Sequence, residues 1–128
     1  MRMAVDASAL LAILLDEPDA DILLAKLLGA TKAWISPINW WEVQVRMRSI
    51  YGEAGEVKSG VWMESLGLIV EPVTLAQAQT AAAAFSRYKG RPTHLNLGDT
   101  FAYALAQVKG VPLLSKGDDF KHTDVRVV

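Results

Sequence analysis

Several acidic residues of this chain stand where their side chains could act together. Asp6 directly follows an apolar segment, residues 3–5, and Asp118 and Asp119 follow a second one, residues 111–115. If both segments are parallel strands, these acids lie at the carboxyl edge of one sheet, where ligands collect in open α/β sheets. Asp also caps helices and starts turns, so the positions alone leave a structural interpretation open.

Two further acids belong to predicted helices. Asp99 lies in the first turn of one helix, and Ala102 and Ala106 share its face. That face is small and apolar, so the acid should point toward the protein, although a first-turn acid also complements the helix dipole. Glu42 lies in an earlier helix, beside an apolar stripe and among polar residues. Periodicity places Glu42 on a solvated flank.

A cluster of these carboxylates would need a cation, because like charges at one edge raise each other's pKa. The chain has no cysteine, and hard oxygen ligands select Mg²⁺ or Mn²⁺ over Zn²⁺. Such an ion can polarise a phosphate and generate a hydroxide. We therefore expect a nuclease with Mg²⁺, or alternatively Mn²⁺, as its cofactor.

Charge is unevenly placed along the chain. The net charge of −1 gives no overall attraction to nucleic acid, yet no acid occurs between positions 71 and 99, where Arg87, Lys89 and Arg91 cluster. We expect these three residues to hold flanking phosphates of an RNA substrate and Tyr88 to stack on a base. A solvated loop would explain the same cluster without RNA.

Composition and pattern predict one α/β domain over residues 1–128. The chain is 52% hydrophobic and 21% charged, which fits a packed core. Strands alternate with helices, which indicates a central, mostly parallel sheet of four or five strands flanked by helices. Strands are expected at 3–5, 33–35, 68–71, 111–115 and 125–128, and helices at 8–15, 18–29, 37–51, 53–66, 75–88 and 98–109.

The longest apolar run, residues 9–15, is far shorter than the roughly 20 residues of a membrane-spanning helix. The acidic stretch that follows it offers no signal-peptide cleavage site. Together with the absence of cysteine, this predicts a cytoplasmic protein without membrane attachment.

The helix predicted over residues 37–51 carries two apolar stripes. One consists of Ile38, Trp41 and Val45, and the other of Trp40, Val43, Met47, Ile50 and Tyr51. One stripe can serve the core, so the other needs a dimer interface or a bound protein. Alternatively, neighbouring helices of the same chain cover both.

Taken together, these residues resemble the PIN domain family, and specifically the VapC-type toxins of type II toxin–antitoxin pairs. The resemblance covers almost the whole chain and rests on the order and spacing of short motifs. These are VDASA at 5–9, Ser36-Pro37 followed by Glu42, LNLGD at 95–99, YALA at 103–106, LLSKGDDF at 113–120 and Thr123-Asp124.

The resemblance implies a Mg²⁺-dependent endoribonuclease toxin whose cognate antitoxin occupies the active-site groove. It also implies a homodimer, which would use the second stripe of the 37–51 helix. Asp6, Glu42 and Asp99 match the family's metal-binding acids, and Ser8 and Asn96 match polar positions near them.

The fourth acid departs from the commoner pattern. Many PIN domains place it three residues before the phenylalanine, and Gly117 occupies that position here. Asp118 or Asp119 would take over as a metal ligand, and we favour Asp119 as the catalytic one.

Other interpretations fit less well. A phospho-acceptor receiver domain lacks its adjacent acids, and a haloacid dehalogenase phosphatase lacks the second Asp, since position 8 is Ser. The alternative that stays open is a catalytically inactive PIN-fold module that binds RNA or protein. Three matched acids argue against it, because an unused acidic cluster destabilises its own fold.

Overall fold

A computed structural model describes all residues, 1–128. Its centre is a four-stranded sheet in the order β3-β2-β1-β4, with every neighbouring pair parallel. The strands are β1 (Arg2–Val5), β2 (Lys32–Ile35), β3 (Ile69–Val70) and β4 (Leu113–Leu114). The helices are α1 (Ala7–Leu14), α2 (Ala20–Leu28), α3 (Pro37–Tyr51), α4 (Glu53–Leu66), α5 (Leu75–Tyr88) and α6 (Leu97–Lys109). The predicted α/β class with a parallel sheet is confirmed.

Alternating side chains of the strands supply two cores, one on each face of the sheet. Met3 and Val5 of β1 belong to the core that α1, α2 and α3 cover, whereas Ala4 between them belongs to the core that α5 and α6 cover. Strand β4 divides in the same way, with Leu114 on the first face and Leu113 on the second. This period of two is what a strand buried on both faces requires.

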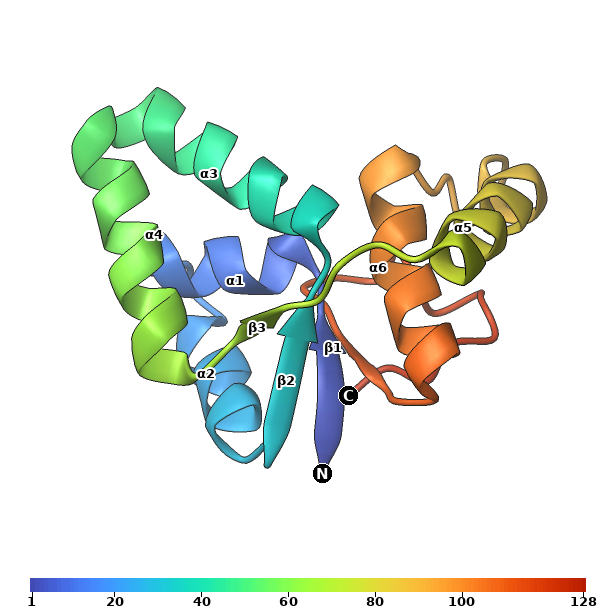
Figure 1. The fold of residues 1–128 in the computed structure, drawn as a ribbon, viewed down its shortest axis with the longest axis horizontal. Helices are drawn as coiled ribbons and strands as arrows, with labels where there is room; N and C mark the ends of the chain where they lie inside the picture. The colour runs from blue at the N-terminus through green and yellow to red at the C-terminus, as the bar shows by residue number, and fades with distance from the viewer.

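The parallel sheet brings distant segments to one edge. Met3 pairs with Ala33 of β2, and Val5 pairs with Leu114 of β4. In Figure 1 the carboxyl ends of β1 and β2 point toward the region between α3 and α6, and both chain termini lie at the opposite end. The backbone N–H of Asp6 still donates to the Leu114 carbonyl, at 2.9 Å. Residues that leave β1 and β4 therefore start from adjacent positions.

Local signals explain where α3 begins. The Ser36 hydroxyl accepts a hydrogen bond from the N–H of Ile38, at 3.3 Å, and Pro37 occupies the first helical position. Both are favoured at a helix start, because the cap pairs a free N–H and proline lacks one. Val43 and Met47 of α3 are fully buried, which fixes the face that the helix turns to the core.

Some predicted boundaries are wrong. The second helix begins at Ala20, since Pro18 lies in the preceding turn. Strands β3 and β4 are two residues each, and the last expected strand is a single bridge from Leu113 to Val127. The first helix, expected at 8–15, begins at Ala7 and is capped by Asp6. None of the helices has both the length and the apolar character needed to cross a membrane.

Candidate active site

Asp6 is the most deeply placed of the acids. It follows β1 and caps α1, and its Oδ2 accepts hydrogen bonds from the N–H of Ser8 at 3.2 Å and from the Ser8 hydroxyl at 2.6 Å. Only 4% of its surface is exposed. Burial raises the pKa of Asp6 to about 7 against these hydrogen bonds, with further contributions from the nearby charges of Asp99 and Glu42. Asp6 is therefore both the N-cap of α1 and a residue of the candidate site.

Ser8 connects the start of α1 to the segment after β4. Its Oγ accepts a hydrogen bond from the N–H of Lys116, at 3.1 Å, and lies 3.3 Å from the Ser115 hydroxyl. The same hydroxyl donates to Asp6. Ser8 therefore holds Asp6 in a fixed position and ties it to the loop that carries Asp119.

Glu42 points into the protein, contrary to the solvated flank that periodicity assigned to it. The Nδ2 of Asn39, a fully buried residue, donates to Glu42 Oε1 at 2.8 Å and to the carbonyl of Gly98 at 2.9 Å. One amide thus joins α3 to the start of α6 and orients the carboxylate. A Cβ on Gly98 would lie 2.3 Å from Glu42 Oε1, so only glycine leaves room for that carboxylate.

Asp99 is held by its own helix. Asn96 caps α6 by accepting from the N–H of Asp99 at 2.8 Å, and Asp99 Oδ2 accepts from the N–H of Asn96 at 3.0 Å. Burial raises the pKa of Asp99 against the Asn96 hydrogen bond, and the charges of Asp119 and Glu42 add to the rise. This capping box fixes one carboxylate oxygen and leaves Oδ1 for a ligand.

Only one of the two acids after β4 reaches the site. Asp119 lines the same pocket as Asp6, whereas the side chain of Asp118 is 82% exposed and pairs with Lys121 at 3.7 Å. Gly117 takes the left-handed backbone conformation, with φ at +83°, that starts this turn. The geometry favours Asp119 over Asp118.

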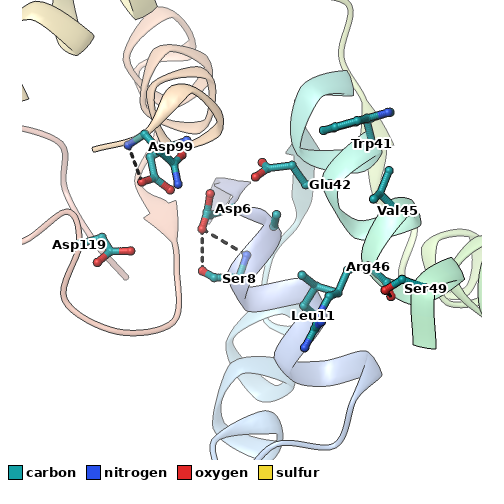
Figure 2. Close-up of a pocket in the computed structure, with 12 residues that line it drawn as sticks. Asp6, Ser8, Leu11, Trp41, Glu42, Val45, Arg46, Ser49, Asp99 and Asp119 are labelled. Atoms are coloured by element: carbon teal, nitrogen blue, oxygen red, sulfur yellow. Dashed lines mark hydrogen bonds between the residues drawn. The ribbon is translucent and has the colours of Figure 1, made fainter. Parts of the chain in front are cut away.

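These acids surround one pocket of about 510 Å³. Figure 2 shows Asp99 and Asp119 on one side, Asp6 and Ser8 in the middle, and the side chains of α3 on the other side. The lining residues are Asp6, Ala7, Ser8, Leu11, Trp41, Glu42, Val45, Arg46, Ser49, Asn96, Asp99 and Asp119. Four carboxylates from four separate parts of the chain therefore face one space, and Ser8 and Asn96 lie beside them as expected.

The pocket suits a hard divalent cation by its donor set. All four of its acidic groups offer oxygen, and no cysteine or histidine lines it. No three carboxylates approach closely enough to enclose an ion with the side chains as they stand. Burial raises the pKa of both Asp6 and Asp99, and nearby carboxylate charges add to the rise. A cation would remove the repulsion and allow the side chains to close on it.

The basic loop does not reach this pocket. Arg87, Lys89 and Arg91 are absent from its lining, and Arg87 lies 3.9 Å from Asp124. The expectation that Tyr88 stacks on a base is wrong. Its ring is buried against Tyr103, with ring centroids 5.7 Å apart, and its hydroxyl donates to Asp124 at 3.2 Å.

The second apolar stripe of α3 was assigned to a dimer interface, and this prediction is wrong for Val43 and Met47. Val43 and Met47 are buried in the core of the same chain. Trp41 and Val45 of the first stripe are exposed and line the pocket, and Ile50 and Tyr51 at the end of the second stripe are exposed as well. The stripes could be recognised from the sequence, but which of them faces the core could not.

Sequence reasoning missed several residues of this site. Arg46 lines the pocket, and Asn39 orients Glu42. Asn39 lies three residues before Glu42 and Arg46 four residues after it, and this spacing on one helix face was the available signal. Nothing local indicated Gly98, because its role depends on a helix distant in sequence.

Comparison with known proteins gives one consistent result. The PIN domain family model matches residues 3–126. Ribonuclease VapC of Mycolicibacterium smegmatis is 41% identical over 128 residues, which covers 98% of this chain and 99% of that protein. Ribonuclease VapC30 of Mycobacterium tuberculosis is 38% identical and covers 98% of both.

Solved structures agree on the fold. Mycobacterium tuberculosis VapC20, described as a sarcin-ricin loop cleaving toxin, has a TM-score of 0.81 at 18% identity and covers 98% of both chains. A chain from Rickettsia felis VapBC2, bound to a promoter DNA fragment, has a TM-score of 0.79 at 14% identity and covers 99% of this chain and 96% of that one. From the family match and the close relatives, this chain belongs to the PIN domain family and, within it, to the VapC type.

Proposed function

We propose that this protein is a divalent-metal-dependent endoribonuclease and the toxin of a toxin–antitoxin pair. As a VapC-type member of its family it is a ribonuclease, in line with the names of its relatives. The observation that carries the metal-dependent mechanism is the meeting of four carboxylates in one pocket. Four carboxylates around one pocket, with Asp6 buried among them, are costly for a protein that does not use them.

Asp6, Glu42, Asp99 and Asp119 are the residues that would hold the cation, which we take to be Mg²⁺ with Mn²⁺ as a substitute. When bound, it would polarise the scissile phosphate and make a water molecule nucleophilic at neutral pH. The residues around the pocket position these carboxylates. Asn39 and Gly98 set the position of Glu42, as Ser8 and Asn96 do for Asp6 and Asp99.

The electrostatics of Asp6 agree with this role. With a pKa of about 7 in the absence of metal, its buried carboxyl carries a proton for part of the time at neutral pH. A cation beside it favours the ionised form and displaces that proton. Metal binding should therefore release protons near neutral pH and tighten as the pH rises.

We also propose a cognate antitoxin as the partner that restrains this activity. The Rickettsia felis structure is a VapBC assembly, and the related chains are named as toxins or ribonucleases. An antitoxin that covers the pocket would exclude both RNA and metal. Cytoplasmic RNA as the substrate and a homodimer as the working form remain part of the proposal.

The test is cleavage of RNA by the purified protein with Mg²⁺, with EDTA, and with Mn²⁺ restored after EDTA. We expect cleavage with either metal, none in EDTA, and RNA ends that recur at defined positions when sequenced. An Asp6→Asn variant should leave the RNA intact under all three conditions. Undiminished cleavage in EDTA would reject the metal, and RNA binding without cleavage under every condition would favour the inactive binding module.

A further inference from the structure

The pocket has a second wall that the metal does not explain. Successive turns of α3 contribute Trp41, Val45 and Arg46 to it, opposite Asp99 and Asp119 (Figure 2). The Trp41 side of this wall is strongly exposed, at 62% for Trp41 and 47% for Val45. Two exposed apolar side chains beside a set of carboxylates offer a place for a ligand with an apolar face.

Arg46 is the only positively charged residue that lines the pocket. It lies four residues after Glu42, a spacing at which Glu and Arg commonly pair on a helix. It nevertheless forms no ion pair with any acid. Glu42 accepts a hydrogen bond from Asn39 instead. Its guanidinium is therefore free for an anion, and its planar donor groups match a phosphate.

Trp41 offers a surface for the other part of a nucleotide, its base. Exposure of an indole to water is unfavourable, and stacking of a base against it recovers that free energy. Trp41 and Arg46 lie five residues apart on α3, so their Cα atoms are separated by about 7.5 Å along the helix axis, and a single strand of RNA that crosses the pocket can offer a base to one side chain and a nearby phosphate to the other. A pocket of about 510 Å³ has room for such a group.

We infer that Trp41 and Arg46 form a nucleotide-binding subsite, in which a base of single-stranded RNA stacks on the indole while a neighbouring phosphate pairs with the guanidinium. This rests on the proposed ribonuclease function and adds to it the part of the site that positions the substrate. Because both residues share the pocket with Asp6 and Glu42, the bound nucleotide lies next to the phosphate that is cut.

RNA accounts for both residues better than a protein ligand does. A protein side chain could cover Trp41, but an acidic one suited to Arg46 would also meet the four carboxylates of the pocket. An RNA strand brings a base and a phosphate together in every unit, and its phosphates are also what a metal bound by those carboxylates attracts. The antitoxin remains the competing occupant that the experiment must separate.

The experiment compares Trp41→Ala, Trp41→Phe and Arg46→Gln with the wild-type protein on a labelled single-stranded RNA of random sequence. Single-turnover cleavage is measured over a range of enzyme concentrations and salt, with Mg²⁺ present. We expect Trp41→Ala to raise the enzyme concentration at half-saturation by roughly 5- to 150-fold, the range for loss of one stacked base. The rate at saturation should change little, and Trp41→Phe should restore most of the affinity.

Arg46→Gln should behave differently. It removes one phosphate contact, so the dependence of log affinity on log salt should become shallower by about 0.7. Trp41→Ala should leave that slope unchanged. Matched controls on the same helix are Tyr51→Ala and Arg48→Gln, an exposed aromatic and an exposed cation that do not line the pocket. Both controls should bind and cut RNA as the wild-type protein does.

Three results would overturn the inference. In the first, the wild-type protein cleaves the RNA and the variants at Trp41 and Arg46 match it in affinity and salt dependence. In the second, the variants cleave RNA as the wild-type protein does but are no longer inhibited when the antitoxin is added to the same assay. In the third, Trp41→Phe loses as much RNA affinity as Trp41→Ala, which indicates that the shape of the indole matters and not the stacking of a base on it. Failure of the wild-type protein to cleave any RNA would instead contradict the proposed function.

Discussion

Replacement of Gly98 by alanine tests the geometry of the site with a single methyl group. The new Cβ would lie 2.3 Å from Glu42 Oε1, and ordinary van der Waals contact begins at 3.4 Å. The carboxylate must therefore move by about 1 Å or more. It is the end of a flexible side chain, so it should yield before the backbone of α6 does. Its hydrogen bond from Asn39, at 2.8 Å, would be distorted or lost.

The effects on stability and on activity should separate. Alanine is favoured over glycine in a helix by about 1 kcal/mol, and overpacking at a buried position costs about 1–3 kcal/mol. The net change in the free energy of unfolding should therefore stay within about 2 kcal/mol. Displacement of a catalytic group by about 1 Å can cost roughly 100-fold in rate. We expect a folded protein with RNA cleavage lowered by about that factor.

The assay pairs thermal unfolding with single-turnover RNA cleavage in saturating Mg²⁺. Gly60→Ala is the matched control, because Gly60 lies within α4 and a Cβ there would meet nothing within 4 Å. This control should gain up to about 1 kcal/mol of stability and keep full activity. Gly98→Ala protein that melts normally and cuts RNA at the wild-type rate would refute the placement of Glu42 in the site.

Three further predictions concern charge. Asp99→Asn should abolish RNA cleavage and leave metal-free stability unchanged or higher, because it removes a repulsive charge; an active variant in the cleavage assay would reject the assignment. The pKa of Asp6 is about 7 when folded against 3.8 for the free side chain, so the folded state holds its proton more tightly. Metal-free stability should therefore fall between about pH 4 and pH 7, by at most roughly 4 kcal/mol, and urea unfolding of Asp6→Asn should lack that fall. Combined replacement of Arg87, Lys89 and Arg91 by alanine should weaken RNA binding and reduce its salt dependence, and an unchanged slope would make that loop ordinary surface.

The fold was predictable where periodicity and end signals agree. The predicted bounds of α3, α4 and α5 match the structure, helped by Ser36-Pro37 at one start and Gly67 at one end. Strands β3 and β4 are shorter than their apolar runs. Both end opposite the last residues of their neighbours, because Val70 pairs with Ile35 and Leu114 pairs with Val5. The place where a neighbouring strand ends is a tertiary property that the run itself does not contain.

The site was predictable to a similar degree. Asp6 and Asp99 could be named as candidates from their places after a strand and at a helix start, with helix capping and the helix dipole as the alternatives. Glu42 needed the family resemblance, because its inward direction depends on Asn39 and on the missing Cβ of Gly98. No sequence period encodes a contact between α3 and the start of α6. The choice of Asp119 over Asp118 likewise needed the conformation of one loop.

Calorimetric titration of Mn²⁺ into the metal-free protein tests the central claim most directly. If Asp6, Glu42 and Asp99 bind one cation together, the wild-type protein should bind Mn²⁺ saturably and release protons near neutral pH. Asp6→Asn and Glu42→Gln should each bind it at least about 10-fold more weakly, as expected for loss of a ligand or of its support. Equal Mn²⁺ affinity in all three proteins, or no binding in any, would contradict the account.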